Sequence, residues 1–192
     1  MRIRSAIRRP WLLSALLGIV IVSGSCNLTR YAVRKSGPVL GKSVSVLFSY
    51  KDPKMARQAA PALLVILEGL LASDPDNPTI LRLLCRGLYE YPFGFLQSDY
   101  EMLRESDPAA AERIRRRARM QYVRVYEFGL RLLRTHEVEL TLQKTPKADI
   151  ERKIAKLDKK AVPALLWTAL GAGSDDGQVG IVFIDILETV QR

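Results

Sequence analysis

Residues 52–91 decide the fold of this chain; they read DPKMARQAAPALLVILEGLLASDPDNPTILRLLCRGLYEY. Asp52 and Pro53 together supply an N-cap and a first-turn proline, a common start of a helix. Apolar residues then recur at three- and four-residue spacing: Met55, Ala59, Leu63, Leu67 and Leu70. This period predicts a helix from about Pro53 to Ala72, with a kink at Pro61.

The stretch Asp74-Pro75-Asp76-Asn77-Pro78 ends that helix and starts another. Asn77 can cap the new helix, and Pro78 can open it because the first turn has no use for a proline's missing N–H. The second helix is expected to run to about Tyr91.

Asp107 and Pro108 repeat this start signal. The stretch Ala109–Arg134 contains Gly129 but no other glycine or proline, so we expect a long third helix there. Its apolar stripe passes through Ile114, Ala118, Tyr122, Val125, Leu132 and Leu133.

A fourth start signal lies at Thr145 and Pro146. The helix that follows is charged as far as about Pro163 and apolar over Ala164–Leu170. Because strand-like alternation is almost missing, the sequence predicts an all-α chain of antiparallel helical hairpins.

The second and third helices match the spacing of a degenerate tetratricopeptide repeat, which would make the domain an α-solenoid. Leu81, Leu84, Cys85 and Leu88 fit the first helix of such a pair, with Cys85 as the small residue. Ala118 fits the small position of the second helix, 33 residues later. A regular repeat places these positions about 12 residues apart, so an insertion of about 21 residues is expected. Matches of this kind also occur by chance in helical bundles.

The N-terminus resembles a secretory signal over residues 1–25. Four arginines (Arg2, Arg4, Arg8 and Arg9) precede the apolar run Trp11–Val22, which ends in Ser23-Gly24-Ser25-Cys26. The run spans about 18 Å as a helix, short of the roughly 30 Å hydrocarbon core, which disfavours a permanent transmembrane helix.

Cys26 after small residues resembles the lipobox of bacterial lipoproteins, although Ser23 departs from the usual aliphatic residue. That resemblance implies a lipid on Cys26, and Asn27 after it favours the periplasmic face of a Gram-negative outer membrane. The alternatives are an ordinary signal cleaved near Ser25 and an uncleaved anchor. Residues 26–50 are then expected to be a membrane tether with little regular structure, apart from a short element around Val44–Phe48.

The net charge of +10 on 192 residues first suggests a nucleic acid or an anionic membrane as partner. Loss of residues 1–25 removes four arginines and no acid, which leaves +6 on 167 residues and weakens the case for nucleic acid. With Cys26 lipidated, Cys85 is the one remaining thiol, and its apolar helical surroundings predict a buried, inert residue.

The chain resembles the TRAP-transporter-associated tetratricopeptide lipoprotein family, the T component or TatT. The resemblance covers about residues 52–171 and rests on five segments: Asp52-Pro53 leading to Ala60-Pro61, Leu67-Glu68-Gly69-Leu70-Leu71, residues 74–78, Tyr89 to Phe95, and Val162-Pro163-Ala164-Leu165-Leu166-Trp167-Thr168-Ala169. It implies a lipid-anchored periplasmic helical scaffold that binds the solute-binding protein of a tripartite ATP-independent transporter, handles apolar or organic-acid ligands, and can form homo-oligomers.

Family members continue with helical repeats beyond the position of Gly171, so we expect this chain to be a C-terminally shortened member. Residues 51–171 would be the helical domain and 172–192 a divergent tail. Within the tail, Ser174–Gly180 is typical of a turn, and Ile181–Val190 fits a last short helix or a strand.

Aromatic residues are the strongest candidates for a ligand or partner surface. They gather around Pro92 and Gly94, which are expected to break the helix, and on the two following apolar helices. Core packing is the competing interpretation. The candidates are Tyr89, Tyr91, Phe93, Phe95, Tyr122, Tyr126 and Trp167.

Charged residues point to a solvated surface more than to chemistry. An arginine run at Arg113–Arg124 spreads around its helix, which favours water, lipid headgroups or a charged partner over nucleic acid. The charged stretch Lys144–Lys160 has mixed spacing and predicts a solvent-exposed helix. His136, at an expected helix end, is the sole imidazole, and no catalytic, metal or cofactor constellation surrounds it.

We therefore expect a scaffold without an enzymatic activity. A general envelope scaffold for outer-membrane or cell-wall assembly is the second hypothesis, and a small envelope hydrolase that uses His136 is the third.

Overall fold

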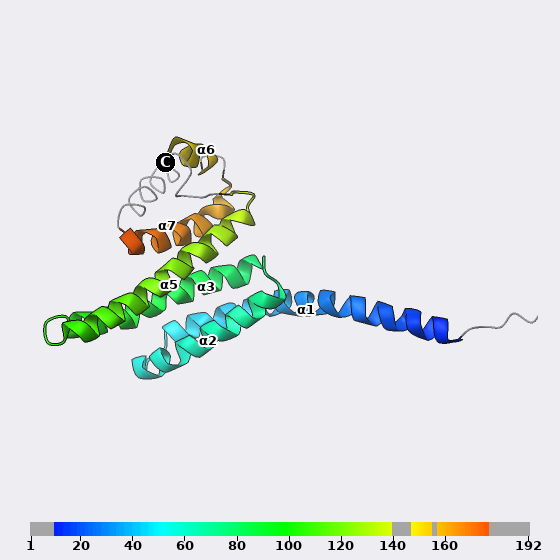
Figure 1. Cartoon of the computed structure of the whole chain (residues 1–192), viewed down its shortest axis with the longest axis horizontal. Helices are drawn as coiled ribbons and strands as arrows, with labels where there is room; N and C mark the ends of the chain where they lie inside the picture. The colour runs from blue at the N-terminus through cyan, green and yellow to red at the C-terminus, as the bar shows by residue number, and fades with distance from the viewer. Residues whose placement is uncertain (1–9, 140–146, 155–156, 177–192) are drawn as a thin grey trace, which may run out of the picture.

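The computed structural model describes residues 10–139, 147–154 and 157–176. Every regular element in these ranges is helical, which confirms the predicted all-α class (Figure 1). In chain order the elements are α1 (Pro10–Phe48), α2 (Pro53–Ser73), α3 (Pro78–Tyr91), η1 (Pro92–Leu96), α4 (Gln97–Leu103), α5 (Pro108–Arg134), α6 (Lys147–Ile154), η2 (Lys159–Ala161) and α7 (Val162–Asp176).

Each long helix packs on the next one along the chain. α1 lies on α2, α2 on α3, α3 on α5, and α5 on α7, while α3 also contacts α1 and α7 (Figure 1). The core follows these contacts and is built mainly of fully buried aliphatic residues. The largest are Leu67, Ile80, Leu81, Leu84, Leu88, Leu133, Ile154 and Leu165. Whether these hairpins form true tetratricopeptide repeats stays a prediction.

The caps of α2 and α3 form as the sequence predicts. Oδ1 of Asp52 accepts hydrogen bonds from the backbone N–H groups of Lys54 and Met55, at 2.9 and 3.3 Å. Oδ1 of Asn77 accepts from the N–H groups of Thr79 and Ile80, at 3.0 and 3.1 Å. These side chains satisfy N–H groups that have no partner inside a helix.

The predicted apolar stripe of α2 is wrong by one residue over most of its length. The buried face consists of Ala56, Ala60, Leu64, Leu67 and Leu71, so only Leu67 is shared with the prediction. Met55 and Ala59 are exposed instead. α2 is apolar nearly all round, and a helix of this composition gives no unique phase until its neighbours are known.

The expectation of little regular structure over residues 27–50 is also wrong, because α1 continues to Phe48. Val33, Gly37 and Val44 are buried where α1 packs on α2 and α3. A Cβ at Gly37 would lie 3.0 Å from Cγ2 of Thr79, so the contact depends on a residue without a side chain. A glycine adds nothing to a hydrophobic pattern, which explains why the helical period is weak here.

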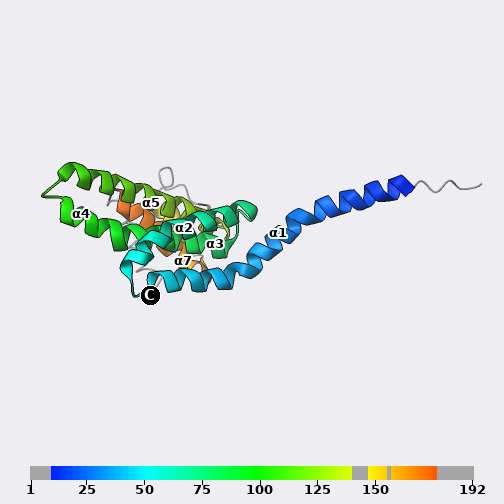
Figure 2. The same ribbon diagram turned by 90° about the horizontal axis from the view of Figure 1, so that it is seen from below.

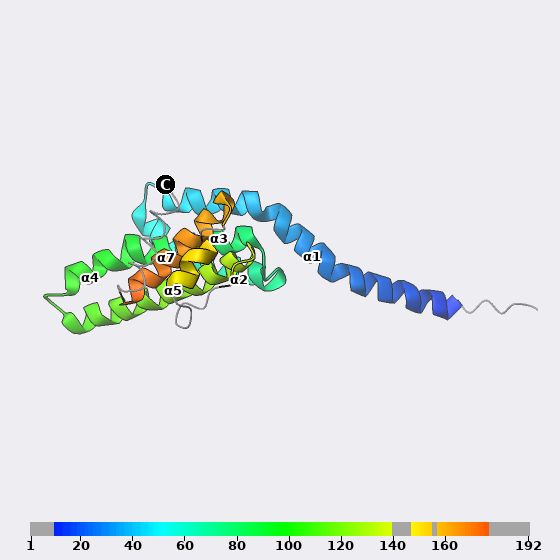
Figure 3. The same cartoon turned by 90° about the horizontal axis from the view of Figure 1, so that it is seen from above.

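α1 curves before it reaches the rest of the domain (Figures 2 and 3). Pro38 lies inside this helix, and a proline there removes one backbone hydrogen bond and bends the helix. The helical state of residues 10–25 does not bear on whether a signal peptidase removes them. The roles of residues 1–25 and 26–50 therefore stay predictions.

Pro92 and Gly94 do not break the helix, contrary to the prediction. The backbone stays helical through η1, a π-helical turn in which the N–H of Gln97 bonds to the carbonyl of Pro92 five residues earlier. α4 then extends this path and packs on α5. η1 and α4 occupy the insertion that the repeat spacing predicts between α3 and α5.

The fourth predicted helix is divided into α6, η2 and α7. The predicted apolar segment Ala164–Leu170 lies within α7. The turn predicted from Ser174 is wrong at its start, because α7 continues to Asp176. The rest of that turn and the element predicted at Ile181–Val190 lie outside the described residues.

α5 and α7 approach each other at two glycines. A Cβ on Gly129 would lie 2.6 Å from Oγ1 of Thr168 and 2.8 Å from its Cα. A Cβ on Gly171 would lie 2.8 Å from Cα of Tyr126. Real Cβ atoms essentially never come within 3.0 Å of other heavy atoms, so both positions require glycine for this packing.

Candidate functional site

Four of the seven predicted aromatic residues form one cluster, which joins α3 and η1 to α5 and α7. The ring of Tyr89 is stacked on Phe93 at 5.8 Å between centroids. It also lies 5.6 Å from Tyr122 and 6.0 Å from Trp167, in tilted geometry. We call these four residues the Tyr89 cluster. Such tilted and offset pairs are the preferred arrangements of aromatic rings.

The Tyr89 cluster is closed at one end and open at the other. Burial, with a smaller contribution from Tyr89, raises the pKa of the Tyr122 hydroxyl to about 12. Phe93 is 59% exposed, although its ring is stacked on Tyr89. The cluster therefore closes the α3–α5–α7 packing and presents one aromatic ring to solvent, which combines both interpretations made from the sequence.

Tyr91 and Phe95 form a separate pair, with ring centroids 5.8 Å apart. Tyr91 is buried, and the Arg117 side chain both donates a 3.1 Å hydrogen bond to its hydroxyl and lies over its ring. Arg57 of α2 lies over Phe95 and donates to the Phe95 carbonyl at 3.0 Å. These cations cover the two rings, so the pair is mainly structural.

The last predicted aromatic residue, Tyr126, lies one helical turn after Tyr122 on α5. Its side chain is half-buried against the core, and its backbone packs directly on Gly171 of α7. The position of Tyr126 is therefore explained by the close approach of two helices. The sequence pattern groups all seven aromatic residues, whereas the structure divides them.

Arginines of α5 make contacts both within the helix and to other elements. Arg115 makes a bidentate contact with Glu112, at 2.7 and 3.0 Å, and Arg124 forms an ion pair with Glu68 of α2. Phe128 lies between Arg124 and Arg131, with each guanidinium within 5.8 Å of its ring centre. Such cation–aromatic contacts stabilise by about 0.5 to 1 kcal/mol at exposed sites.

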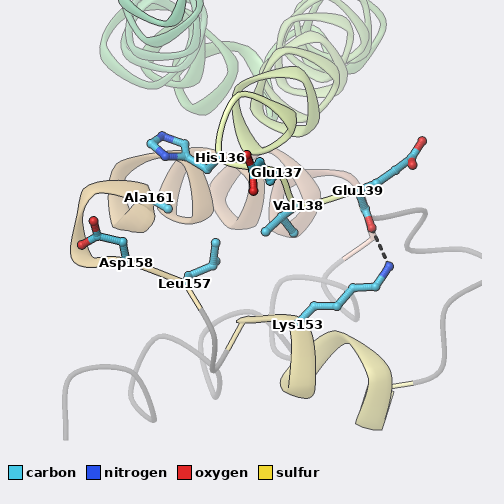
Figure 4. A pocket seen from close by; sticks show the side chains of 8 residues that line it. All are labelled: His136, Glu137, Val138, Glu139, Lys153, Leu157, Asp158 and Ala161. Atoms are coloured by element: carbon cyan, nitrogen blue, oxygen red, sulfur yellow. Dashed lines mark hydrogen bonds between the residues drawn. The ribbon is translucent and has the colours of Figure 1, made fainter.

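His136 lies just after α5, as predicted, and lines a cavity of about 490 Å³ (Figure 4). His136 and Asp158 lie toward one side of this cavity and Lys153 toward the other (Figure 4). Nζ of Lys153 donates a 2.7 Å hydrogen bond to the backbone carbonyl of Glu139. Val138, Leu157 and Ala161 give the wall an apolar part.

Cys85 is fully buried, as predicted, with its Sγ 3.8 Å from the carbonyl oxygen of Val125. Burial raises the pKa of its thiol to about 12, so the reactive thiolate is strongly disfavoured at neutral pH. In the described part of the chain, no three His, Cys, Asp or Glu residues are grouped closely enough to hold a metal ion.

The outer surface of α1 and α2 is a candidate site that the sequence pattern does not predict. By length and composition alone, α2 is apolar enough to cross a membrane. Only 28% of its most apolar window is buried inside the domain, so most of this window is at least partly exposed. A groove of about 480 Å³ separates α2 from α1. Met55, Ala59 and Leu63 line this groove and are three of the five residues predicted for the core. A correct assignment of the buried side of α2 would have left Met55, Ala59 and Leu63 on its exposed side.

These features define a class: an all-α domain whose successive helices pack side by side. The family model of the TRAP transporter T-component matches residues 49–175, about two thirds of the chain. The chain therefore belongs to the TRAP transporter T-component (TAtT) family, as its resemblance implies. The family is described as a TRAP transporter component, and it is not a known enzyme family. No curated protein and no solved structure matched the chain.

Proposed function

We propose that this protein is a lipid-anchored periplasmic scaffold that binds the solute-binding subunit of a TRAP transporter. Family membership is the observation that carries the proposal, since it associates the chain with TRAP transport. We also propose that the scaffold helps to present or store an apolar or organic-acid ligand, and that it has no catalytic activity of its own.

The proposed anchor is a lipid on Cys26 at the periplasmic face of the outer membrane. The sequence Ser23-Gly24-Ser25-Cys26 after an apolar run supports it. Replacing Cys26 with Ser should abolish labelling by a radioactive fatty acid and release or misprocess the protein. Unchanged labelling of the variant would exclude this anchor.

For the partner surface, the exposed edge of the Tyr89 cluster is the best candidate. Phe93 presents an apolar ring to solvent that is held in place by Tyr89. A rigid exposed aromatic residue binds a partner at low cost in side-chain entropy, and such residues often dominate interface energetics. The adjoining half-buried Trp167 would support the contact.

Capture of the solute-binding protein from a detergent extract tests the proposed partner. Phe93→Ala should weaken capture by roughly tenfold or more, as expected for a dominant aromatic contact. Met120→Ala is the matched control, because Met120 is 60% exposed on α5 and lies outside the cluster. Capture of only lipoprotein-sorting factors or cell-wall proteins would instead favour the general envelope scaffold.

A further inference from the structure

One face of α1 carries apolar side chains and lysines in a single helical row. Residues recur at three- and four-residue spacing, on the side opposite to the buried Val33 and Val44. All members of the row are exposed. They are Leu28, Tyr31, Lys35, Val39, Lys42, Val46 and, just after the helix, Tyr50.

The row continues sideways onto α2 across the groove of about 480 Å³. Val39, Val46 and Tyr50 line one wall, and Met55 and Ala59 line the other. Farther along α2, Val65 and Ile66 are 68% and 55% exposed. We call this combined surface the α1–α2 face. Exposed apolar surface of this extent generally marks an interaction site.

The charges around the α1–α2 face are mainly positive, and Asp52 between Lys51 and Lys54 is the exposed acid among them. The chain has no acidic residue before Asp52. The exposed cations that flank the apolar side chains come from both helices and the turn between them. They are Lys35, Lys42, Lys51 and Lys54.

We propose that the α1–α2 face lies flat on an anionic lipid bilayer, with its apolar side chains among the headgroups. Lysines beside apolar residues extend to lipid phosphates while their aliphatic stems stay in the apolar layer. Tyr31 lies near the start of the row and Tyr50 at its end, and tyrosine favours the boundary between headgroups and acyl chains. Lys35 lies 5.5 Å above the ring of Tyr31, so its charge is already directed over this surface.

Continuity of the chain favours lipid over a protein as the occupant. α1 runs without interruption from the apolar segment Trp11–Val22 through Cys26 to this row. A lipid on Cys26 would place Leu28, two residues later, at the membrane surface. This inference rests on the membrane attachment in the proposed function. The row from Leu28 to Tyr50 is about 33 Å long at 1.5 Å per residue, so it can follow the surface over the whole hairpin.

Fluorescence quenching in nanodiscs tests the proposal with the full chain extracted from membranes. An environment-sensitive fluorophore is attached to Val46→Cys on the face, and to Met120→Cys as the matched exposed control on α5. The buried Cys85 should not react, and protein without an added cysteine measures any background at Cys26. Nitroxide carried on the lipid should quench the Val46 position several-fold more than the Met120 position in discs that contain phosphatidylglycerol.

Charge reversal then tests the electrostatic part. Lys35→Glu with Lys42→Glu should reduce quenching at the Val46 position to the level of the Met120 control. Replacing phosphatidylglycerol with phosphatidylcholine should also reduce quenching at the Val46 position. Arg113→Glu with Lys160→Glu, a matched pair of exposed cations away from this face, should leave quenching unchanged.

Three results would overturn the proposal. A Val46 fluorophore that reports water in the discs shows that the face is not on the bilayer. If the Val46 fluorophore becomes shielded from water in detergent as protein concentration rises, the face binds a second copy of the chain. If shielding requires added solute-binding protein, the face binds that protein. Capture of the solute-binding protein is measured on the same samples, so loss of capture with intact quenching refutes the proposed partner alone.

Discussion

Arg34 of α1 donates a 2.8 Å hydrogen bond from Nε to Oδ2 of Asp74, across 40 residues of sequence. Oδ2 of Asp74 also accepts a 3.1 Å bond from Nδ2 of Asn77, whose Oδ1 caps α3. The Asp74 side chain is 3% exposed, whereas that of Arg34 is 65% exposed. One carboxylate therefore attaches α1 to the turn between α2 and α3.

Asp74→Ala should lower the free energy of unfolding by about 1 to 3 kcal/mol. The substitution removes a buried carboxylate, so the Asn77 amide loses the acceptor of its 3.1 Å hydrogen bond. Asp76→Ala is the matched control at an exposed position of the same turn and should change stability little. Urea denaturation followed by circular dichroism measures both. Equal losses in the two variants would contradict a special role for Asp74.

The same carboxylate predicts a loss of stability in acid. The hydrogen bond from Arg34, aided by Asn77, lowers the pKa of Asp74 below its ordinary value. The unfolded chain therefore binds this proton more readily, so the stabilisation is complete above the unfolded pKa of about 4 and is lost as pH falls through the folded pKa. The melting-temperature difference between wild type and Asp74→Asn should be constant above about pH 5 and shrink below about pH 4. A difference that stays constant down to pH 2 would refute this.

The sequence was sufficient for elements with strong local signals. Asn77 and Pro78 mark the start of α3 because a cap and a proline act within one helical turn. Cys85 falls in the core because α3 has a clear apolar period. The all-α class and the family follow from the same local features.

The sequence was insufficient where packing between distant segments decides. The phase of α2 depends on α1, and α1 itself is held by Gly37 and by Arg34, which no hydrophobic pattern reveals. Pro92 remains within a continuous helical path because the π-turn accommodates it. Tyr89 and Tyr91 face different partners because residues two apart in an α-helix point about 200° from each other, a separation that their closeness in sequence hides.

Gly129→Ala should destabilise the α5–α7 packing by about 1 to 3 kcal/mol, since the new methyl meets backbone atoms of Thr168 that cannot move aside. Gly69→Ala is the matched control. It also lies inside a helix, but its Cβ would meet nothing within 4 Å, so it should stabilise by about 0.5 to 1 kcal/mol. Thermal unfolding measures the two changes. Stabilisation by both substitutions would show that α5 and α7 are farther apart than described.

Cys85 should react with a thiol reagent at pH 8 only when the domain opens. Its thiol is fully buried, and burial raises its pKa to about 12 from an ordinary value near 9. The raised pKa also means that this group stabilises the fold fully below about pH 9, and that its contribution is lost as pH rises toward 12. The rate of reaction should rise steeply with urea, and Cys85→Ser reports the background from Cys26. Rapid reaction of Cys85 in native buffer would contradict its burial.

Glu137→Gly should stabilise the end of α5. The N–H of Val138 bonds to the carbonyl of Leu133 at 3.2 Å, and the N–H of Glu137 bonds to that of Arg134 at 3.0 Å, which is the Schellman pattern. Glu137 has φ of 63°, a left-handed conformation that glycine adopts without strain. The substitution should therefore raise the free energy of unfolding by about 0.5 to 1 kcal/mol.

Two matched variants make this prediction specific to the left-handed position. Glu137→Val should lower stability, because a β-branched residue tolerates positive φ poorly. Glu139→Gly, two residues later and also exposed, has no positive φ to relieve and should not stabilise. Urea titrations of the three variants at pH 7 give the order Glu137→Gly above wild type above Glu137→Val. Stabilisation by Glu139→Gly, or an inverted order, would show that the conformation of Glu137 does not limit the end of α5.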